Sequence, residues 1–286
     1  MGRAVRGWLS VPAPVAGLAW GRRTHLMGVV NVTPDSFSDG GRYFDAAAAI
    51  ARGEALAAAG AGILDVGGES TRPGALDVPP EEELRRVIPV VAGLAKAARV
   101  PVSIDTTKSV VAEAALDAGA ALVNDISGFR FDPAMAAMVA RRGAPAALMH
   151  IRGTPRTMQV NPQYRDPVAE ICASLRASIA LAVRAGIPEE RLIVDPGIGF
   201  GKSLEHNLDI LARLREFRSL GRPILVGVSR KSFLGRLTDL PPEERAIPSA
   251  GAAGWCIAAG ADLLRVHDVA ETESVRRVVD AIARGG

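Results

Sequence analysis

The chain has 286 residues, of which 48% are hydrophobic and only 4% aromatic, so it can bury a large core of Ala, Val, Leu and Ile. This composition favours a parallel sheet covered by helices over a β-sandwich. A net charge of +3, without runs of basic residues, argues against a nucleic-acid-binding protein.

The N-terminal segment, 1–25, precedes the first long apolar run. Residues 7–21 are uncharged and follow Arg3 and Arg6, which faintly resembles a signal peptide, but two prolines interrupt the run. We expect this segment to form a β-hairpin or an extended arm that packs on one large domain, 26–286.

Cysteine usage and the length of the apolar runs indicate the compartment. Cys172 and Cys256 have no spacing typical of a zinc site or a disulfide framework, which favours a reducing cytoplasm. The other long uncharged run, 247–261, is too short to span a bilayer, so no membrane partner is expected.

Short apolar runs alternate with helical patterns from residue 26 onward. The predicted strands are 26–30, 63–66, 102–104, a strand beginning at 122, 146–149, 192–194, 223–226 and 263–266. The helices predicted after them are 45–59, 81–98, 107–118, 133–142, 166–185, 204–218, 250–259 and 271–283. Two irregular loops, 151–165 and 234–248, are long enough to be lids or binding loops.

Eight strand–helix units without hairpin signals predict an α/β fold, a single (β/α)8 TIM barrel. A doubly wound open sheet is the alternative, but evenly spaced units without a topological break favour closure. Each apolar run ends at a polar side chain, and in such a barrel the active site lies at the C-terminal ends of the strands. We therefore expect these polar groups to converge.

The segment 195–203, Asp-Pro-Gly-Ile-Gly-Phe-Gly-Lys-Ser, follows the sixth run. It is not a P-loop, because Pro196 stands where that motif requires Gly, and its glycines do not fit the dinucleotide fingerprint. It is either a flexible strand-to-helix turn or a backbone cleared for a flat ligand, with Phe200 available to stack. The acid at this strand end favours the ligand.

Three strand ends carry acids or an amide. Asp105, Asn124 and Asp195 would together suit a heterocycle with an amidine-like edge, which could satisfy carboxylates and an amide at once. The alternative is a structural network with Arg side chains or backbone amides.

A second set of residues is cationic and polar. Arg72, Arg265, His267 and Asn31 suit an anion, and Asn31 could also ligate a hard metal bound to that anion; a surface Arg pair is the alternative. Only four of the 34 basic residues are Lys, so Lys231, after the seventh run, hints that a compact ammonium is required there.

Eight motifs in register resemble the ordered motif set of the dihydropteroate synthase family. They are 31–41 (NVTPDSFSDGG), 67–74 (GGESTRPG), 103–106 (SIDT), 124–128 (NDISG), 149–150 (MH), 195–202 (DPGIGFGK), 229–233 (SRKSF) and 265–268 (RVHD). The resemblance covers residue 26 to the C-terminus. It implies synthesis of 7,8-dihydropteroate from 6-hydroxymethyl-7,8-dihydropterin diphosphate and p-aminobenzoate, with release of pyrophosphate, Mg2+ as cofactor, and a homodimer.

The same resemblance implies roles for individual residues. Pterin binding falls to Asp105, Asn124, Ile126, Met149, Asp195, Phe200 and Lys231. Diphosphate binding falls to Asn31, Arg72, Arg265 and His267, with Mg2+ at Asn31. The p-aminobenzoate site takes Thr71, Arg72, Pro73, Phe200 and Ser229. The catalytic residues are Asp105, Asp195 and Lys231, with Asp35 and Phe37 on the first loop.

One departure and three rival functions bear on this interpretation. Ile247-Pro248-Ser249 stands where the family usually has Gly before Ser or Thr, which puts that loop's geometry in doubt. A corrinoid-linked methyltetrahydrofolate methyltransferase has no use for the anion set. A non-catalytic paralogue should have lost first-loop or anion residues, which are intact here. A phosphate-binding aldolase would use Lys231 as a Schiff base and leave the paired acids unexplained.

Overall fold

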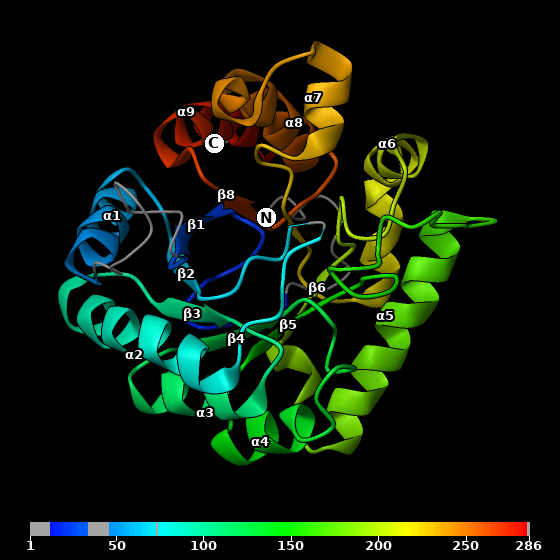
Figure 1. Ribbon diagram of the computed structural model, residues 1–286. Helices are drawn as coiled ribbons and strands as arrows, with labels where there is room; N and C mark the ends of the chain where they lie inside the picture. The colour runs from blue at the N-terminus through cyan, green and yellow to red at the C-terminus, as the bar shows by residue number, and fades with distance from the viewer. Residues whose placement is uncertain (1–11, 34–45, 73, 285–286) are drawn as a thin grey trace, which may run out of the picture.

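The computed structural model describes residues 12–33, 46–72 and 74–284, and these ranges form a parallel β-barrel surrounded by helices (Figure 1). The eight strands found in them pair in the order β6-β5-β4-β3-β2-β1-β8-β7. Their bounds are β1 His25–Asn31, β2 Ile63–Gly67, β3 Val102–Asp105, β4 Leu122–Asp125, β5 Ala146–Met149, β6 Leu192–Asp195, β7 Leu225–Val226 and β8 Leu263–Val266. A parallel bridge between Val194 and Ile224 closes the ring, so the predicted barrel is confirmed.

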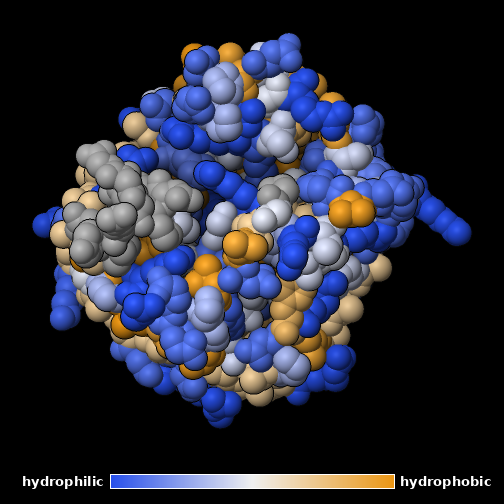
Figure 2. Space-filling model, viewed as in Figure 1, coloured by the Kyte–Doolittle hydropathy of each residue, from blue (hydrophilic) through white to orange (hydrophobic). Residues whose placement is uncertain are grey.

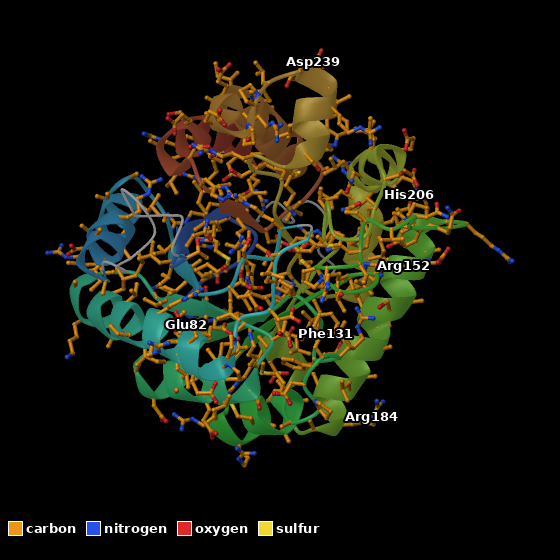
Figure 3. All side chains as sticks on the ribbon, in the orientation of Figure 1. Glu82, Phe131, Arg152, Arg184, His206 and Asp239 are labelled. Atoms are coloured by element: carbon orange, nitrogen blue, oxygen red, sulfur yellow. The ribbon has the colours of Figure 1, made fainter. Side chains whose placement is uncertain are left out.

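Helices cover the outside of the ring, and α9 returns beside α1 (Figure 1). Their bounds are α1 Ala46–Ala58, α2 Pro80–Ala97, α3 Ser109–Asp117, α4 Met135–Arg142, α5 Pro167–Arg184, α6 Leu204–Ala212, α7 Ser232–Thr238, α8 Ala246–Ala258 and α9 Val269–Arg284. Three 3-10 helices also occur in the described ranges, η2 Glu189–Arg191, η3 Leu214–Leu220 and η4 Pro242–Glu244. Side chains crowd the space inside and around the ring (Figure 3).

Two predicted elements after β6 are wrong. The helix expected over 204–218 ends at Ala212 and continues as η3, because Leu214, Phe217 and Leu220 are buried at a spacing of three, which suits three residues per turn. The irregular loop expected over 234–248 instead contains α7, η4 and the start of α8. Pro248 fits there because it occupies the first turn of α8, where a backbone N–H has no helical partner.

The N-terminal end of the barrel is closed by an apolar cluster. Val15, Leu18 and Trp20 pack against strand residues that include Met27 and Ile63, and all five are buried. Val15 and Leu18 exchange two backbone hydrogen bonds across a two-residue turn, which is one antiparallel bridge rather than a developed hairpin. In the described ranges, no helix combines the length and the apolar character needed to cross a membrane.

Candidate active site

The C-terminal ends of the strands bring together polar side chains from distant parts of the sequence. Asn31 ends β1, Asp105 ends β3, and Asp195 ends β6, while Asn124 lies beside Asp105 in the β3–β4 register. Figure 2 shows many hydrophilic residues on this face, with a few hydrophobic ones among them near its centre. The predicted convergence at the barrel mouth is therefore confirmed for the acids and the amide.

Arg265 on β8 lies at the centre of a buried network. Its Nε donates to Asp65 Oδ2 at 2.6 Å and its Nη2 donates to Asp105 Oδ2 at 2.7 Å. Asn124 Nδ2 and Ser103 Oγ also donate to Asp65, at 3.1 and 2.6 Å. The guanidinium that the sequence suggested for an anion thus lies among the acids suggested for a heterocycle.

Asp65 is a residue that the sequence analysis missed. It is fully buried in the middle of β2, inside the run Ile63–Val66 that was predicted to be a plain apolar strand. A charged residue within such a run is a usable signal, because acids are almost never buried without a partner. Here the partner is Arg265, 200 residues away in the sequence.

Burial changes the protonation of the acids. It raises the pKa of Asp105 to about 7, although Arg265 opposes the shift, because one guanidinium compensates two neighbouring carboxylates incompletely. Burial also raises the pKa of Asp195, against the Lys231 ammonium and the Gly197 N–H, which donates to Asp195 Oδ1 at 2.6 Å. Burial lowers the pKa of Lys231 to about 8. A ligand that donates hydrogen bonds to Asp105 and Asp195 would stabilise their ionised forms.

The turn after β6 is built from glycines and carries Phe200. Gly197 and Gly201 have φ values of +70° and +68°, and a Cβ on either would lie 2.0 and 2.5 Å from the carbonyl oxygens of His150 and Arg152. The turn is therefore held against the end of β5 rather than loose. Phe200 packs beside Ile126 and Met149, and the Lys231 Nζ lies 4.6 Å from its ring centroid.

Lys202 and His150 anchor this turn, although the sequence analysis assigned them no role beyond membership of motifs. Lys202 Nζ is 3.0 Å from His150 Nδ1 and 2.9 Å from the Phe200 carbonyl, and the Lys202 residue is 3% exposed. Burial and the Lys202 charge lower the pKa of His150 to about 2, so His150 is neutral and can accept this bond.

The turn after β7 brings Ser229 beside His267. The Ser229 Oγ accepts from the His267 backbone N–H at 3.1 Å and lies 3.0 Å from its Nδ1. Arg230, between Ser229 and Lys231, has a φ of 57°, and Ser249 Oγ holds this backbone by accepting from the Arg230 N–H at 2.8 Å. The Ser of the unusual Ile247-Pro248-Ser249 segment therefore supports the turn that carries Lys231.

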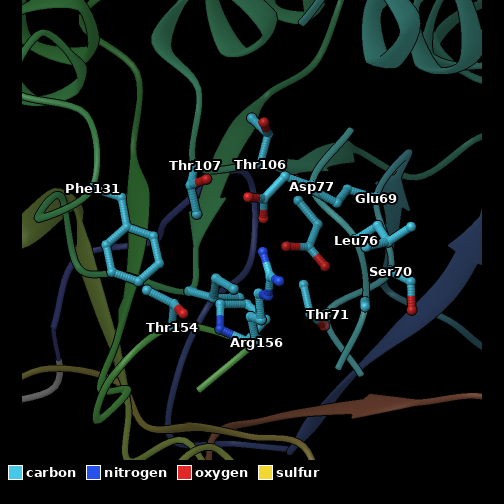
Figure 4. A pocket seen from close by; sticks show the side chains of 14 residues that line it. Glu69, Ser70, Thr71, Leu76, Asp77, Thr106, Thr107, Phe131, Thr154 and Arg156 are labelled. Carbon is cyan, nitrogen blue, oxygen red and sulfur yellow. The ribbon is translucent and has the colours of Figure 1, made fainter. Parts of the chain in front are cut away.

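The loop after β2 forms one wall of a cavity of about 260 Å³ that reaches Asp105. Figure 4 shows Thr71 and Leu76 on one side of this cavity and Phe131 and Thr154 on the other. Arg72 is exposed, and its charge is one of those that lower the pKa of His267. Asp35, Phe37 and Pro73, three of the predicted site residues, lie outside the described residues.

The expected Mg2+ can be tested against the donors present. The described residues contain no group of three or more His, Cys, Asp or Glu side chains that could hold a metal ion by themselves. Asn31, at the end of β1, offers one amide oxygen. Mg2+ is commonly held by one or two protein oxygens together with water and substrate phosphates, so this donor set fits a metal that arrives with a diphosphate.

Comparisons with known proteins agree on one family. The profile of the family described as pterin binding enzyme matches residues 27–267. The dihydropteroate synthase of Synechocystis sp. is 47% identical over 266 residues, covering 93% of this chain and 92% of that protein.

Solved structures give the same result. The Yersinia pestis dihydropteroate synthase in complex with a sulfonamide drug matches with a TM-score of 0.89 and 43% identity, covering 95% of this chain and 98% of that one. The Xanthomonas albilineans enzyme with 4-aminobenzoic acid matches with a TM-score of 0.88 and 46% identity, covering 96% and 98%. The chain therefore belongs to the dihydropteroate synthase family of pterin-binding enzymes and has that activity in folate biosynthesis.

Proposed function

We propose that the barrel mouth joins 6-hydroxymethyl-7,8-dihydropterin diphosphate to p-aminobenzoate by a dissociative substitution at the pterin methylene. The carbon–oxygen bond to the diphosphate breaks first, and the electron pair leaves with pyrophosphate. The aniline nitrogen then attacks the methylene cation and loses a proton. The amine is already a nucleophile, so no Ser–His or Cys–His pair is needed to activate it.

The pterin is proposed to occupy the centre of the mouth. Asp105 and Asp195 would accept hydrogen bonds from the ring N–H groups, and Asn124 and Lys231 would complete its polar edge. The single observation that carries this assignment is that both carboxylates are buried and have raised pKa values, although Arg265 donates to Asp105 and the Gly197 N–H donates to Asp195. The apolar side chains grouped beside them, Ile126, Met149 and Phe200, would contact the ring faces.

The diphosphate is proposed to bind beside the pterin, near Asn31, Arg72, Arg265 and His267. Mg2+ at Asn31 would offset the negative charge that develops on the leaving group. Arg265 already holds its guanidinium within the network, so it can share its charge between the acids and the diphosphate. Arg72 is exposed and would have to move inward with its loop.

The p-aminobenzoate is proposed to bind at the outer rim, against Thr71, Arg72, Pro73, Phe200 and Ser229. The matching structure that holds 4-aminobenzoic acid supports a site for this substrate. Asp35 and Phe37 would cover it from the first loop. Covering the site would exclude water, which otherwise would capture the methylene cation.

The test of this mechanism is pyrophosphate release from dihydropterin diphosphate and Mg2+, with and without p-aminobenzoate. Dihydropteroate should form with p-aminobenzoate. Without p-aminobenzoate, a dissociative step allows positional exchange. An isotope label on the oxygen that bridges the methylene and the diphosphate then moves to non-bridging positions of the neighbouring phosphate in the recovered substrate. Dihydropteroate formation without any such exchange would contradict the dissociative order, and tight pterin binding without turnover would favour a non-catalytic relative.

A homodimer is proposed through the apolar surface formed by α6, α7 and α8. Leu208, Leu237 and Trp255 are 40%, 53% and 55% exposed there, and an isolated chain rarely leaves such a patch uncovered. Trp255→Glu should convert a dimer to a monomer in analytical ultracentrifugation, while the exposed Val278→Glu on α9 should not. A wild-type chain that sediments as a monomer at micromolar concentration would remove this proposal.

The remaining proposals concern organisation and location. Residues 1–25 are proposed as an arm, with a short hairpin, that closes the bottom of one domain, 26–286; the buried Val15, Leu18 and Trp20 support this. A cytoplasmic location is proposed because both cysteines are free thiols, Cys172 and Cys256.

A further inference from the structure

The base of the second loop, the stretch 68–79 between β2 and α2, is held by a buried ion cluster. Lys108 Nζ donates to Glu69 Oε2 and to Glu83 Oε2, both at 2.6 Å. The Glu83 side chain is fully buried, and those of Lys108 and Glu69 are 21% and 19% exposed. Burial raises the pKa of Glu83, whereas the two carboxylates raise the pKa of Lys108. One compact ammonium thus joins two acids.

The cluster fixes both ends of the loop's exposed part. Glu69 also accepts from the backbone N–H of Val78 through Oε1 at 2.8 Å, so one side chain ties residue 69 to residue 78. Between these ends, Gly74 N–H donates to the Pro155 carbonyl at a long 3.3 Å. The described residues of this loop, 70–72 and 74–77, therefore lie between two ends that Glu69 ties together, and Glu69 is oriented by Lys108.

The cluster also relates the loop to the floor of the site. Lys108 follows Asp105 by three residues, and Glu83 lies on α2, which packs closely over the end of β2. A Cβ on Gly68 would lie 2.6 Å from Val87 Cγ1 and 3.0 Å from Glu83 Cγ. The ion cluster thus joins β2, β3 and α2 at the level of the candidate pterin carboxylate.

The rarity of Lys strengthens the inference. Of the four Lys residues, Lys96 is exposed, whereas the other three lie at the barrel mouth with buried or half-buried side chains. An ammonium can direct its donors toward two converging carboxylates, whereas the planar guanidinium of Arg needs more room. A chain that uses Arg almost everywhere keeps Lys where this geometry is needed.

We propose that Lys108 is a positioning residue that holds the second loop, through Glu69 and Glu83, in the arrangement that binds p-aminobenzoate. This rests on the proposed role of Thr71 and Arg72 in that site. Lys108 contacts no substrate in this scheme. Its effect is on the order of the loop and therefore on the substrate that the loop covers.

The test compares Lys108→Met with Lys96→Met, the same change at the exposed Lys on the last turn of α2. Lys108→Met should raise KM for p-aminobenzoate about tenfold and leave KM for dihydropterin diphosphate within about twofold. Hydrogen exchange at Val78 should accelerate about tenfold, whereas exchange in β3 should not change. Lys108→Arg, which keeps the charge, should raise the KM for p-aminobenzoate less than Lys108→Met does.

The outcomes separate this inference from the proposed function. An unchanged rate of hydrogen exchange at Val78 in Lys108→Met would overturn the proposal that Lys108 holds the second loop, whatever the KM values are. Equal rises in both KM values with faster exchange throughout the barrel would overturn it too, because that pattern indicates general destabilisation. Faster exchange confined to the loop, with an unchanged KM for p-aminobenzoate, would show that Lys108 holds the loop. It would also overturn the proposal that the loop forms part of the p-aminobenzoate site.

Discussion

Two aspartates at opposite ends of the barrel show how a structural carboxylate differs from a binding one. Asp280, at the N-terminal end, accepts from the Thr24 N–H and Oγ1 at 2.8 and 2.9 Å. It also accepts from Arg276 and Arg284, both at 2.8 Å. Asp105, at the C-terminal end, accepts one hydrogen bond from a side chain among the described residues, at 2.7 Å from Arg265.

The difference lies in the number of donors, because both carboxylates are buried and both touch Arg. Four donors saturate Asp280, which connects α9 to the start of β1 and has no capacity left for a ligand. Asp105 keeps unused acceptor capacity and a raised pKa, so the protein holds it in a less favourable state until a donor-rich ligand arrives. Burial alone therefore does not identify a functional acid, whereas burial with too few donors does.

The largest expected effect is on turnover, from Asp105→Asn. Removing a preorganised charge from the candidate site should lower kcat/KM about 100-fold or more, because the carboxylate stabilises the cationic pterin methylene. The unfolding temperature, Tm, should change little or rise, because the variant loses a buried charge that has too few hydrogen-bond donors. Steady-state kinetics together with calorimetry check this. Near-normal turnover would contradict the dissociative account.

The matched change at the other end, Asp280→Asn, should act on stability. It replaces a saturated carboxylate and leaves Arg276 and Arg284 without their shared anion, so the free energy of unfolding should fall by about 2 kcal/mol. The kcat per folded molecule should stay within about twofold of the wild type. Urea unfolding measures the first quantity, and a loss of kcat as large as that of Asp105→Asn would refute the contrast between the two ends.

The smallest expected effect, taken over one pH unit, is a pH dependence of pterin binding. Below its pKa of about 7, Asp105 is mostly protonated in the free protein, so pterin affinity should rise up to tenfold per pH unit as pH approaches 7 and then level off. The same raised pKa should make the free energy of unfolding decrease as pH rises from about 4 to about 7. Calorimetric titration at several pH values tests the affinity. Asp105→Asn should flatten the profile, and an equally steep profile in that variant would assign the proton elsewhere.

The sequence by itself determined the barrel and the face that holds the candidate site. Short apolar runs with polar ends required buried parallel strands, and the ends of parallel strands meet on one face whatever the details of packing. Asp105, Asn124 and Asp195 could therefore be placed together before any contact was known. The order of the motifs identified the family from the sequence, because each motif is a short continuous stretch that can be recognised without knowledge of tertiary contacts.

Only the tertiary structure decided which charges pair. Asp65 was hidden inside an apolar run, and its partner Arg265 lies 200 residues away, so no local pattern could join them. The bond from Lys108 to Glu69 spans 39 residues, and the end of α6 at Ala212 depends on how η3 buries its side chains. Such pairings arise when the closing barrel brings distant strands within hydrogen-bonding distance. The sequence contains both residues of each pair, but no pattern in it shows that they pair.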